Sequence, residues 1–423
     1  MTLGEEAAEA RTALAAAWAS LPEALRTPTQ FLGRQYAGCG ATIGVMPRCD
    51  LRCRGCYLGD DANRARPIAM HDAKAQLRTL RAWLGPGGNL QLTDGELTLR
   101  SASEVIELIA YARAIGLVPM LMTHGETFRA KPGLLERLMV EGGLSEVSFH
   151  VDATMRGRRG RWARATTERE LDGLRDAMAD LIRNARRRTG RRLEAASTVT
   201  VTRELLDDVS GTVRWFLRNA DAFKMVSFQP LASVGRTDRA LSGVGADELW
   251  QRIADGVGDP DLLRGAGSLG HPACSRFVQG LVSRDGARFV PLYRSDSESE
   301  MRLLDELLER LGGTTFRLDS TARRALRLGR ILARDGVFLA RRVLPHAVRR
   351  VCATGSLRPR YLCFVSHHFM SRAETATPLG GERLAACAFR VPIDGRLEPM
   401  CAVNALGLRE SFYGGDAAPG AAA

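Results

Sequence analysis

The sequence lacks the features of a chain that crosses or leaves the cell membrane. No run approaches the roughly 20 apolar residues that a membrane-spanning helix requires. The first residues, MTLGEEAAEARTALAAAWASL, are acidic and rich in alanine, whereas a secretory signal opens with positive charge. We therefore interpret residues 1–36 as a helical segment of the mature protein. We expect a cytoplasmic location, with at most peripheral contact at the inner face of the membrane.

Further absences narrow the class of protein. The nine cysteines are an odd number, and without an export signal they argue against a disulfide framework and for metal binding in a reducing cytosol. The chain shows no internal repeat and no recognised RNA-binding module, so no specific nucleic-acid partner is expected. Arginine far outnumbers lysine. The net charge of +12 favours an anionic partner, such as lipid headgroups or a phosphorylated substrate, unless it reflects an arginine-rich genome.

Short apolar runs alternate with helical patterns in the first half of the chain. Such alternation is typical of a parallel sheet covered by helices, and six units predict an α/β fold, a partial (β/α)6 TIM-like parallel barrel. Reacting groups in such barrels lie where strands end. The predicted strands are Ala41–Met46, Asn89–Thr93, Val118–Thr123, Glu146–Val151, Ala196–Val201 and Lys224–Gln229. The predicted helices are His71–Leu84, Ser103–Ile115, Lys131–Glu141, Thr166–Arg188 and Glu204–Asn219.

After residue 240 the pattern changes, which suggests four parts. Residues 37–240 are assigned to the barrel, after the N-terminal helical segment. Residues 241–350 are assigned to a helical, basic and amphipathic region. Residues 351–423 are expected to be a loop-rich extension with further cysteines, ending in the tail GGDAAPGAAA, whose composition is typical of disorder.

Three cysteines, Cys49, Cys53 and Cys56, follow the first predicted strand in MPRCDLRCRGC. Thiolates bind soft metals, but a structural zinc site uses four ligands, and no histidine follows within this loop. A cubane iron–sulfur cluster held by three cysteines keeps one iron without a protein ligand. The spacing therefore predicts a [4Fe–4S] cluster with one open coordination position. A zinc site or a chance grouping is the alternative.

The CxxxCxxC spacing resembles the signature of the radical S-adenosylmethionine (radical SAM) superfamily. The resemblance implies that the open iron binds SAM and that a reduced flavodoxin- or ferredoxin-type protein supplies an electron. Cleavage of the C–S bond then gives a 5′-deoxyadenosyl radical, which removes a hydrogen atom from the substrate. The aromatic residue usual before the last cysteine is replaced by Gly55, and Tyr57 stands just after Cys56 as a candidate for contact with SAM.

The segment TDGELTL, residues 93–99, follows the second predicted strand. It resembles the Gly-Gly-Glu-Pro segment of the same superfamily, with Asp94 in place of the first glycine and Leu97 in place of proline. The resemblance implies that Asp94, Gly95 and Glu96 hold the ammonium group of SAM. A buried carboxylate needs a cation, and glycine lets the backbone approach a ligand closely.

Polar residues end two of the later predicted strands, and two further polar candidates lie on the fifth. The two-residue period of a strand puts His150 and Asp152 on one face, where they could contact the SAM ribose or the substrate, or simply cap the strand. The segment VSFQPLASVGR, residues 226–236, resembles radical SAM enzymes related to tetraether lipid synthase and the pterin methyltransferases. The remaining candidates are Ser197 and Thr198 for SAM, Gln229 for the adenosine or the substrate, and Arg236 for a carboxylate or phosphate.

Six cysteines lie outside the first three. In CAFRVPIDGRLEPMC, a turn at Asp394–Gly395 would form a hairpin and bring the two end cysteines together. This region resembles the SPASM or twitch auxiliary-cluster modules of radical SAM enzymes. The resemblance implies a second [4Fe–4S] cluster. Its expected ligands are Cys274, Cys363, Cys387 and Cys401, with Cys352 as a substitute for one of them and Cys39 as a structural thiol.

The region from Phe316 to Arg350 carries ten arginines and two aspartates, a net charge of +8. Its arginines alternate with apolar residues at helical spacing, which predicts a helix that lies on anionic lipid or packs against the barrel. With the lipid-synthase resemblance, this favours a lipid substrate that reacts at an unactivated C–H. A ribosomally made peptide or a pterin-like small molecule is the alternative. A non-enzymatic alternative is an iron–sulfur or zinc protein that binds RNA or senses redox state.

Overall fold

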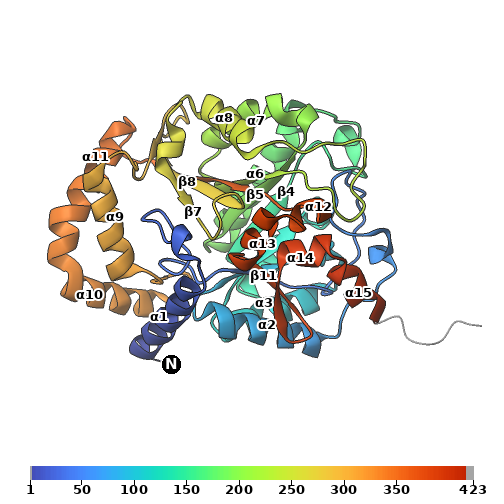
Figure 1. Ribbon diagram of the computed structural model, residues 1–423, viewed down its shortest axis with the longest axis horizontal. Coiled ribbons are helices and arrows are strands. Elements are labelled where there is room, and N and C mark those ends of the chain that lie inside the picture. The colour runs from blue at the N-terminus through green and yellow to red at the C-terminus, as the bar shows by residue number, and fades with distance from the viewer. Residues whose placement is uncertain (1, 416–423) are drawn as a thin grey trace, which may run out of the picture.

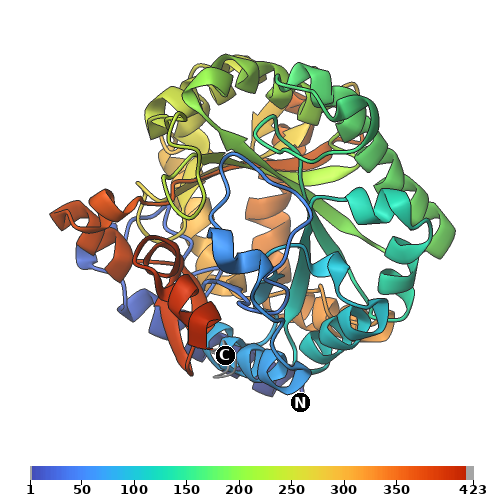
Figure 2. The same ribbon diagram turned by 90° about the vertical axis from the view of Figure 1, so that its right-hand side faces the viewer.

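A curled parallel sheet forms the centre of the molecule (Figures 1 and 2). The structure is a computed structural model that describes residues 2–415, so most of the predicted disordered tail lies outside the described residues. Six strands pair in parallel in chain order, and the predicted α/β partial barrel is confirmed. They are β1 (Cys39–Ala41), β2 (Asn89–Leu92), β3 (Val118–Thr123), β4 (Glu146–His150), β5 (Glu194–Val201) and β6 (Phe223–Pro230).

Helices cover the outer face of this sheet because each buries an apolar stripe. In α2 (Met70–Leu84), for example, Leu77, Leu80 and Leu84 are buried at a spacing of three or four residues. The other helices of this layer are α3 (Ala102–Ala114), α4 (Glu126–Ala130), α5 (Leu134–Val140), α6 (Asp172–Thr189), α7 (Val209–Arg218) and α8 (Ala246–Val257).

The first strand is earlier and shorter than predicted. The sequence suggested Ala41–Met46, but β1 ends at Ala41. The chain then turns away, because Gly44 adopts a φ of 74° and its amide donates a hydrogen bond to the Asp94 carboxylate. Residues 42–46 therefore begin the cysteine loop.

The region after residue 350 contains, among its helices and loops, strands that complete the sheet and that the sequence did not place there. Strand β10 (Arg360–His367) pairs in parallel with β6, and β11 (Phe389–Ile393) pairs in parallel with β1. The predicted hairpin is confirmed, since β11 and β12 (Arg396–Pro399) are antiparallel and the φ angles of Asp394 and Gly395 are 48° and 78°. Antiparallel β8 (Ser275–Val282), flanked by β7 (Ala266–Ser268) and β9 (Phe289–Pro291), extends the other edge.

Short C-terminal helices pack beside the barrel opening. Figure 2 looks into the barrel, and the loop that follows β1 crosses its opening. Helix α15 (Leu408–Gly415) contacts the short helical turn of this loop, Asp60–Asn63. The other C-terminal helices are α12 (Arg372–Thr375), α13 (Pro378–Ala385) and α14 (Met400–Ala405). The C-terminal region thus covers part of the opening.

A second group of helices lies at the opposite end, on the left of Figure 1. Arg317, in the segment before α10, contacts Glu146, the first residue of β4, at 3.2 Å, which places this group at the amino ends of the strands. The group consists of α1 (Leu3–Ala19), α9 (Glu298–Leu311), α10 (Thr321–Phe338) and α11 (Leu344–Ala353), with a π-helical turn at Leu339–Val343. Among the described residues, no helix has both the length and the apolarity needed to span a bilayer.

Candidate cluster and SAM site

The loop with Cys49, Cys53 and Cys56 is fixed across the barrel opening by backbone hydrogen bonds. The amides of Arg52 and Arg54 donate to the carbonyls of Arg156 and Thr154 at 2.9 and 2.8 Å, in the segment that follows β4. The amide of Arg236, after β6, donates to the carbonyl of Leu58 at 2.9 Å. The predicted position at the carboxyl ends of the strands is therefore found.

The three thiols have the environment that a metal cluster needs. Burial raises the pKa of Cys53 and of Cys56, and the charges of the neighbouring thiols raise that of Cys53 further. The thiolate forms of Cys53 and Cys56 are therefore unfavourable without a cation. In the described structure their sulfurs do not all lie within 4.8 Å of one another, whereas the ligands of a tetrahedral zinc ion would lie about 3.8 Å apart. The thiols fit a cluster better than a single zinc ion.

Residues 94–96, which we call the DGE segment, are hydrogen-bonded directly to the cysteine loop. The amide of Gly95 donates to the Met46 carbonyl at 2.7 Å, and that of Glu96 to the Arg48 carbonyl at 2.8 Å. The Glu96 carboxylate, which is 1% exposed, accepts hydrogen bonds from the Thr123 hydroxyl at 2.8 Å and the His124 amide at 2.9 Å. Its position is therefore rigidly defined beside the thiols.

His124 was not predicted from the sequence, although it directly follows the predicted strand Val118–Thr123. Its Nε2 lies 2.8 Å from an Asp50 oxygen and 3.3 Å from a Glu96 oxygen. Burial opposes its charging, but Asp50, Cys49 and Glu96 together raise its pKa to about 10. Nε2 of His124 thus links Glu96 to Asp50 of the cysteine loop, while its Nδ1 accepts a hydrogen bond from the Glu126 amide at 3.1 Å. His124, Asp50 and Cys49 are also close enough to share one metal ion.

His150 and Asp152 lie together, as the strand period predicts. Asp152 is completely buried and accepts hydrogen bonds from His150 and from the Thr200 amide, the latter at 2.9 Å. Burial opposes its ionisation, but the charge and hydrogen bond of His150 and further hydrogen bonds hold its pKa well below the usual value. His150, with 34% of its side chain exposed, is the member that remains accessible.

The candidates Ser197 and Thr198 lie on β5, and Gln229 lies on β6. The structure places the side chain of Ser197 on a different face of the sheet from that of Thr198. The Ser197 hydroxyl donates to the Phe149 carbonyl at 3.0 Å, and its register partner Phe149 packs under the outer helices. Side chains alternate along a strand, so Thr198 and Thr200 point to the other face, where His150 lies 3.2 Å from the Thr200 hydroxyl. Ser197 is therefore corrected to a structural residue. Gln229, the register partner of Thr200, is half-buried on β6.

Asp94 and Tyr57 have structural partners that no pattern in the sequence predicts. The Asp94 carboxylate forms a fully buried ion pair with Arg409 of α15, and the Tyr57 hydroxyl donates to the Asp94 carbonyl. The Arg409 guanidinium also lies 4.8 Å from the centre of the Tyr57 ring. The predicted SAM contacts of these two side chains are therefore corrected to a role in fixing α15 against the site.

Arg236 lies beside the third thiol. Its guanidinium donates to the Leu51 carbonyl at 3.2 Å and hydrogen-bonds Cys56, which counteracts the effect of burial on the pKa of that thiol. The expected contact of Arg236 with a substrate carboxylate or phosphate stays a prediction.

The structure brings three of the four predicted auxiliary ligands together. The charges of Cys274 and Cys387 both act on Cys401 and, with burial, raise its pKa to about 12. The Arg383 Nε donates to the Cys274 sulfur at 3.2 Å, and the Met370 amide donates to the Cys401 sulfur at 3.4 Å.

Two other cysteines lie elsewhere, which corrects their predicted roles. Cys363 is on β10, where it packs with Phe31 and Tyr293 and interacts with Tyr361 rather than with the other thiols. Cys352 is exposed on α11, at the amino end of the barrel.

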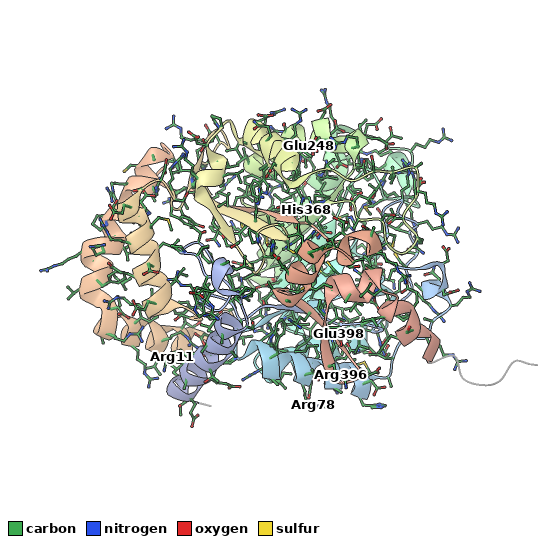
Figure 3. All side chains as sticks on the ribbon, in the orientation of Figure 1. Arg11, Arg78, Glu248, His368, Arg396 and Glu398 are labelled. Atoms are coloured by element: carbon green, nitrogen blue, oxygen red, sulfur yellow. The ribbon has the colours of Figure 1, made fainter. Side chains whose placement is uncertain are left out.

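His368 is a further polar side chain near this second group of thiols, and it is labelled in Figure 3 near the C-terminal helices. Its amide donates to the Cys274 carbonyl at 2.8 Å, and its own carbonyl accepts from Arg383 at 2.7 Å. The His368 Nε2 is buried and has no hydrogen-bond partner in the described structure. Burial, with the charge of Arg383, lowers its pKa to about 4, so the ring is neutral.

Substitution of Gly95 by alanine is expected to disrupt the cysteine loop. A Cβ at this position would lie 2.2 Å from the Arg48 carbonyl oxygen and 2.6 Å from that of Pro47. We expect a loss of about 1–3 kcal/mol in the free energy of unfolding. Thermal unfolding and the iron content after anaerobic reconstitution measure the effect. Gly211→Ala, where a Cβ meets open space on α7, is the matched control. Wild-type stability and iron content in Gly95→Ala would contradict this account.

Comparison with known proteins adds to this geometry. No protein-family model matches the chain. The chain is 26% identical over 207 residues to the 7,8-dihydro-6-hydroxymethylpterin dimethyltransferase of Methanocaldococcus jannaschii, and the match covers 47% of this chain and 37% of that enzyme. The predicted resemblance to a pterin methyltransferase is confirmed over this part of the chain.

The solved structures to which this chain is similar are more distant. The structure of native anSMEcpe with bound AdoMet is 14% identical, with a TM-score of 0.33, over 45% of this chain and 50% of that one. The same protein with AdoMet and the Kp18Cys peptide is 12% identical, with a TM-score of 0.37, over 51% and 57%.

Proposed function

We propose that the chain is a radical SAM enzyme whose catalytic [4Fe–4S] cluster is held by Cys49, Cys53 and Cys56. When bound, this cluster would supply the electron that cleaves SAM to a 5′-deoxyadenosyl radical, which then abstracts hydrogen from an unactivated C–H. The observation that carries the proposal is the placement of three half-buried thiols in one loop across the barrel opening, with that loop hydrogen-bonded to the DGE segment. Three ligands leave one iron free for SAM.

The chain's own residues would bind and orient SAM. The Gly95 backbone can approach a ligand closely, and Glu96 supplies a carboxylate for an ammonium group. His124 fixes that carboxylate through its amide, and His150 and Gln229 offer half-buried polar groups to the adenosyl part or the substrate. The barrel would exclude water from the reacting centre.

A pterin-like small molecule is our first choice of substrate, because the curated relative acts on a pterin. A lipid is the second candidate. The basic helix that favoured a lipid from the sequence lies at the amino end of the barrel, opposite the cysteine loop (Figures 1 and 2). It therefore gives no direct link between a lipid and the reacting centre.

The test is reductive SAM cleavage by the anaerobically reconstituted protein. We expect 5′-deoxyadenosine to form from SAM when a strong reductant is present, and formation to increase when the true substrate is added. Pterin and lipid candidates are compared by incorporation of deuterium from labelled substrate into 5′-deoxyadenosine. A reduced protein that binds metal in this loop but neither binds nor cleaves SAM would exclude the proposal and favour the iron–sulfur or zinc alternative.

We also propose a second [4Fe–4S] cluster, held by Cys274, Cys387 and Cys401. The positions of these thiols around Arg383 support it, and His368 is the candidate for a fourth ligand because its buried Nε2 has no partner among the described residues.

Iron counts separate this second site from the first. We expect about eight irons per wild-type chain and about four in Cys401→Ser, because a whole cubane would be lost. The matched control is Cys363→Ser, another buried thiol, which should keep about eight irons. Equal iron in wild type and Cys401→Ser would remove the second cluster and leave the first proposal intact.

A further inference from the structure

Helices α10 and α11 expose an unusual amount of apolar surface. Six of the fourteen large hydrophobic side chains that are exposed in the described structure fall within 23 consecutive residues. They are Leu326, Leu328, Leu332, Val337, Leu344 and Val348, with exposures between 47% and 69%. Apolar surface that gathers in this way marks an interaction site more often than isolated exposed residues do.

This surface also carries cations that the protein does not neutralise. Arg330, Arg341 and Arg349 are exposed on the same helices and form no ion pair within the described residues. We call the six apolar side chains and these three arginines the Arg–Leu face. Its charge is positive and uncompensated, beside leucine and valine side chains that water solvates poorly.

The opposite side of the same helices accounts for their packing on the protein. Arg327 binds Glu6 at 2.8 Å, Arg342 binds Glu306 at 3.2 Å, and His346 Nε2 lies 2.7 Å from the Leu292 carbonyl oxygen. Polar contacts thus hold the helices to α1, α9 and the barrel, while the apolar residues point to solvent. This is the reverse of a helix whose only role is packing, which would bury its leucines.

We propose that the Arg–Leu face docks on an anionic lipid bilayer surface. A helix with apolar side chains and arginines lies in the headgroup layer, where its apolar side chains enter the acyl boundary and its cations meet lipid phosphates. The proposal is independent of the substrate and of SAM chemistry. Because the face lies at the amino end of the barrel, the docked protein presents its cysteine loop toward the cytosol (Figure 1).

Two other occupants fit the face less well. A nucleic acid would satisfy the arginines but would leave the leucines and valines in water. A second copy of the chain in a symmetric pair would bring uncompensated arginines against one another. Of these three occupants, an anionic bilayer is the one that satisfies both parts of the face.

Vesicle flotation tests the proposal on the full-length, reconstituted protein. We expect the wild type to float with vesicles of equal parts phosphatidylcholine and phosphatidylglycerol at about 0.1 M NaCl, and to remain at the bottom with phosphatidylcholine alone. Arg330→Gln/Arg341→Gln should lower the binding constant about thirtyfold. Val337→Ser/Leu344→Ser should lower it at least about tenfold.

A charge-matched control separates this face from general attraction of a basic protein to anionic lipid. Arg214→Gln/Arg396→Gln removes two exposed arginines from α7 and the β11–β12 hairpin and should bind as the wild type does. All variants should keep their SAM cleavage and their thermal stability. No flotation of the wild type, or equal losses in the control and the face variants, would overturn the proposal. So would a wild-type dimer that the face variants dissociate, detected by sedimentation velocity.

Discussion

Replacement of Cys53 by alanine is expected to reduce SAM cleavage to the level of a blank without protein. The variant keeps two thiols in the loop, and two are too few to hold a cubane that already leaves one iron open. The measurement is 5′-deoxyadenosine formed under reducing conditions, alongside iron content and the electron paramagnetic resonance signal of the reduced cluster. The second group of thiols would still bind iron, so the variant should retain part of the metal but none of the activity.

Cys352→Ala is the control for this substitution, since that thiol is exposed on α11 and distant from the opening. It should cleave SAM as the wild type does. Activity that survives in Cys53→Ala, or that disappears equally in Cys352→Ala, would show that the loop is not the reacting centre.

Arg409→Met is expected to lower the free energy of unfolding by about 3–5 kcal/mol, because it leaves the Asp94 carboxylate buried without its partner. Burial already raises the pKa of Asp94, with Arg409 opposing the shift, and loss of the arginine raises it further. A carboxyl with a raised folded-state pKa loses stability as pH increases above its unfolded value. The deficit should therefore be larger at pH 8 than at pH 5, as measured by denaturant unfolding.

The double variant Asp94→Asn/Arg409→Met should recover part of the loss, because no charge is then left buried. Arg203→Met removes an arginine from an ion pair that is half exposed on both sides, and it should cost no more than about 1 kcal/mol. Similar losses for Arg409→Met and Arg203→Met would mean that the buried pair does not hold α15 in place.

The central fold could be predicted because each βα unit is encoded locally. The strands from Asn89 to Pro230 are short apolar runs, and the helices between them show their own period. The sequence did not predict that β10 and β11 join the barrel, because this depends on pairing with β6 and β1, which lie more than a hundred residues away in the chain. A pattern within the sequence carries no record of such a partner.

The candidate site, like the fold, could be predicted where its residues are close together in the sequence. Cys49, Cys53 and Cys56 stand in one loop, and their spacing is visible without a structure. The Asp94–Arg409 pair joins residues 315 positions apart, so the motif alone suggested a ligand contact where the structure has a structural one. The prediction that Cys363 is a ligand of the second cluster was wrong for a related reason. Spacing along the sequence does not show which way a strand residue points. His124 could have been found by the rule that selected His150.

The partnership of β1 with β11, and of Asp94 with Arg409, has a consequence for how the protein is made. A ribosome releases the chain from its amino end, so the cysteine loop emerges long before the segments that brace it. Until residue 409 has been synthesised, Asp94, which lies next to the cysteine loop, has no ion-pair partner. If the proposed cluster forms, its insertion into a settled pocket would be a step for the finished polypeptide, and a nascent chain stalled midway would expose its sulfurs to oxidation.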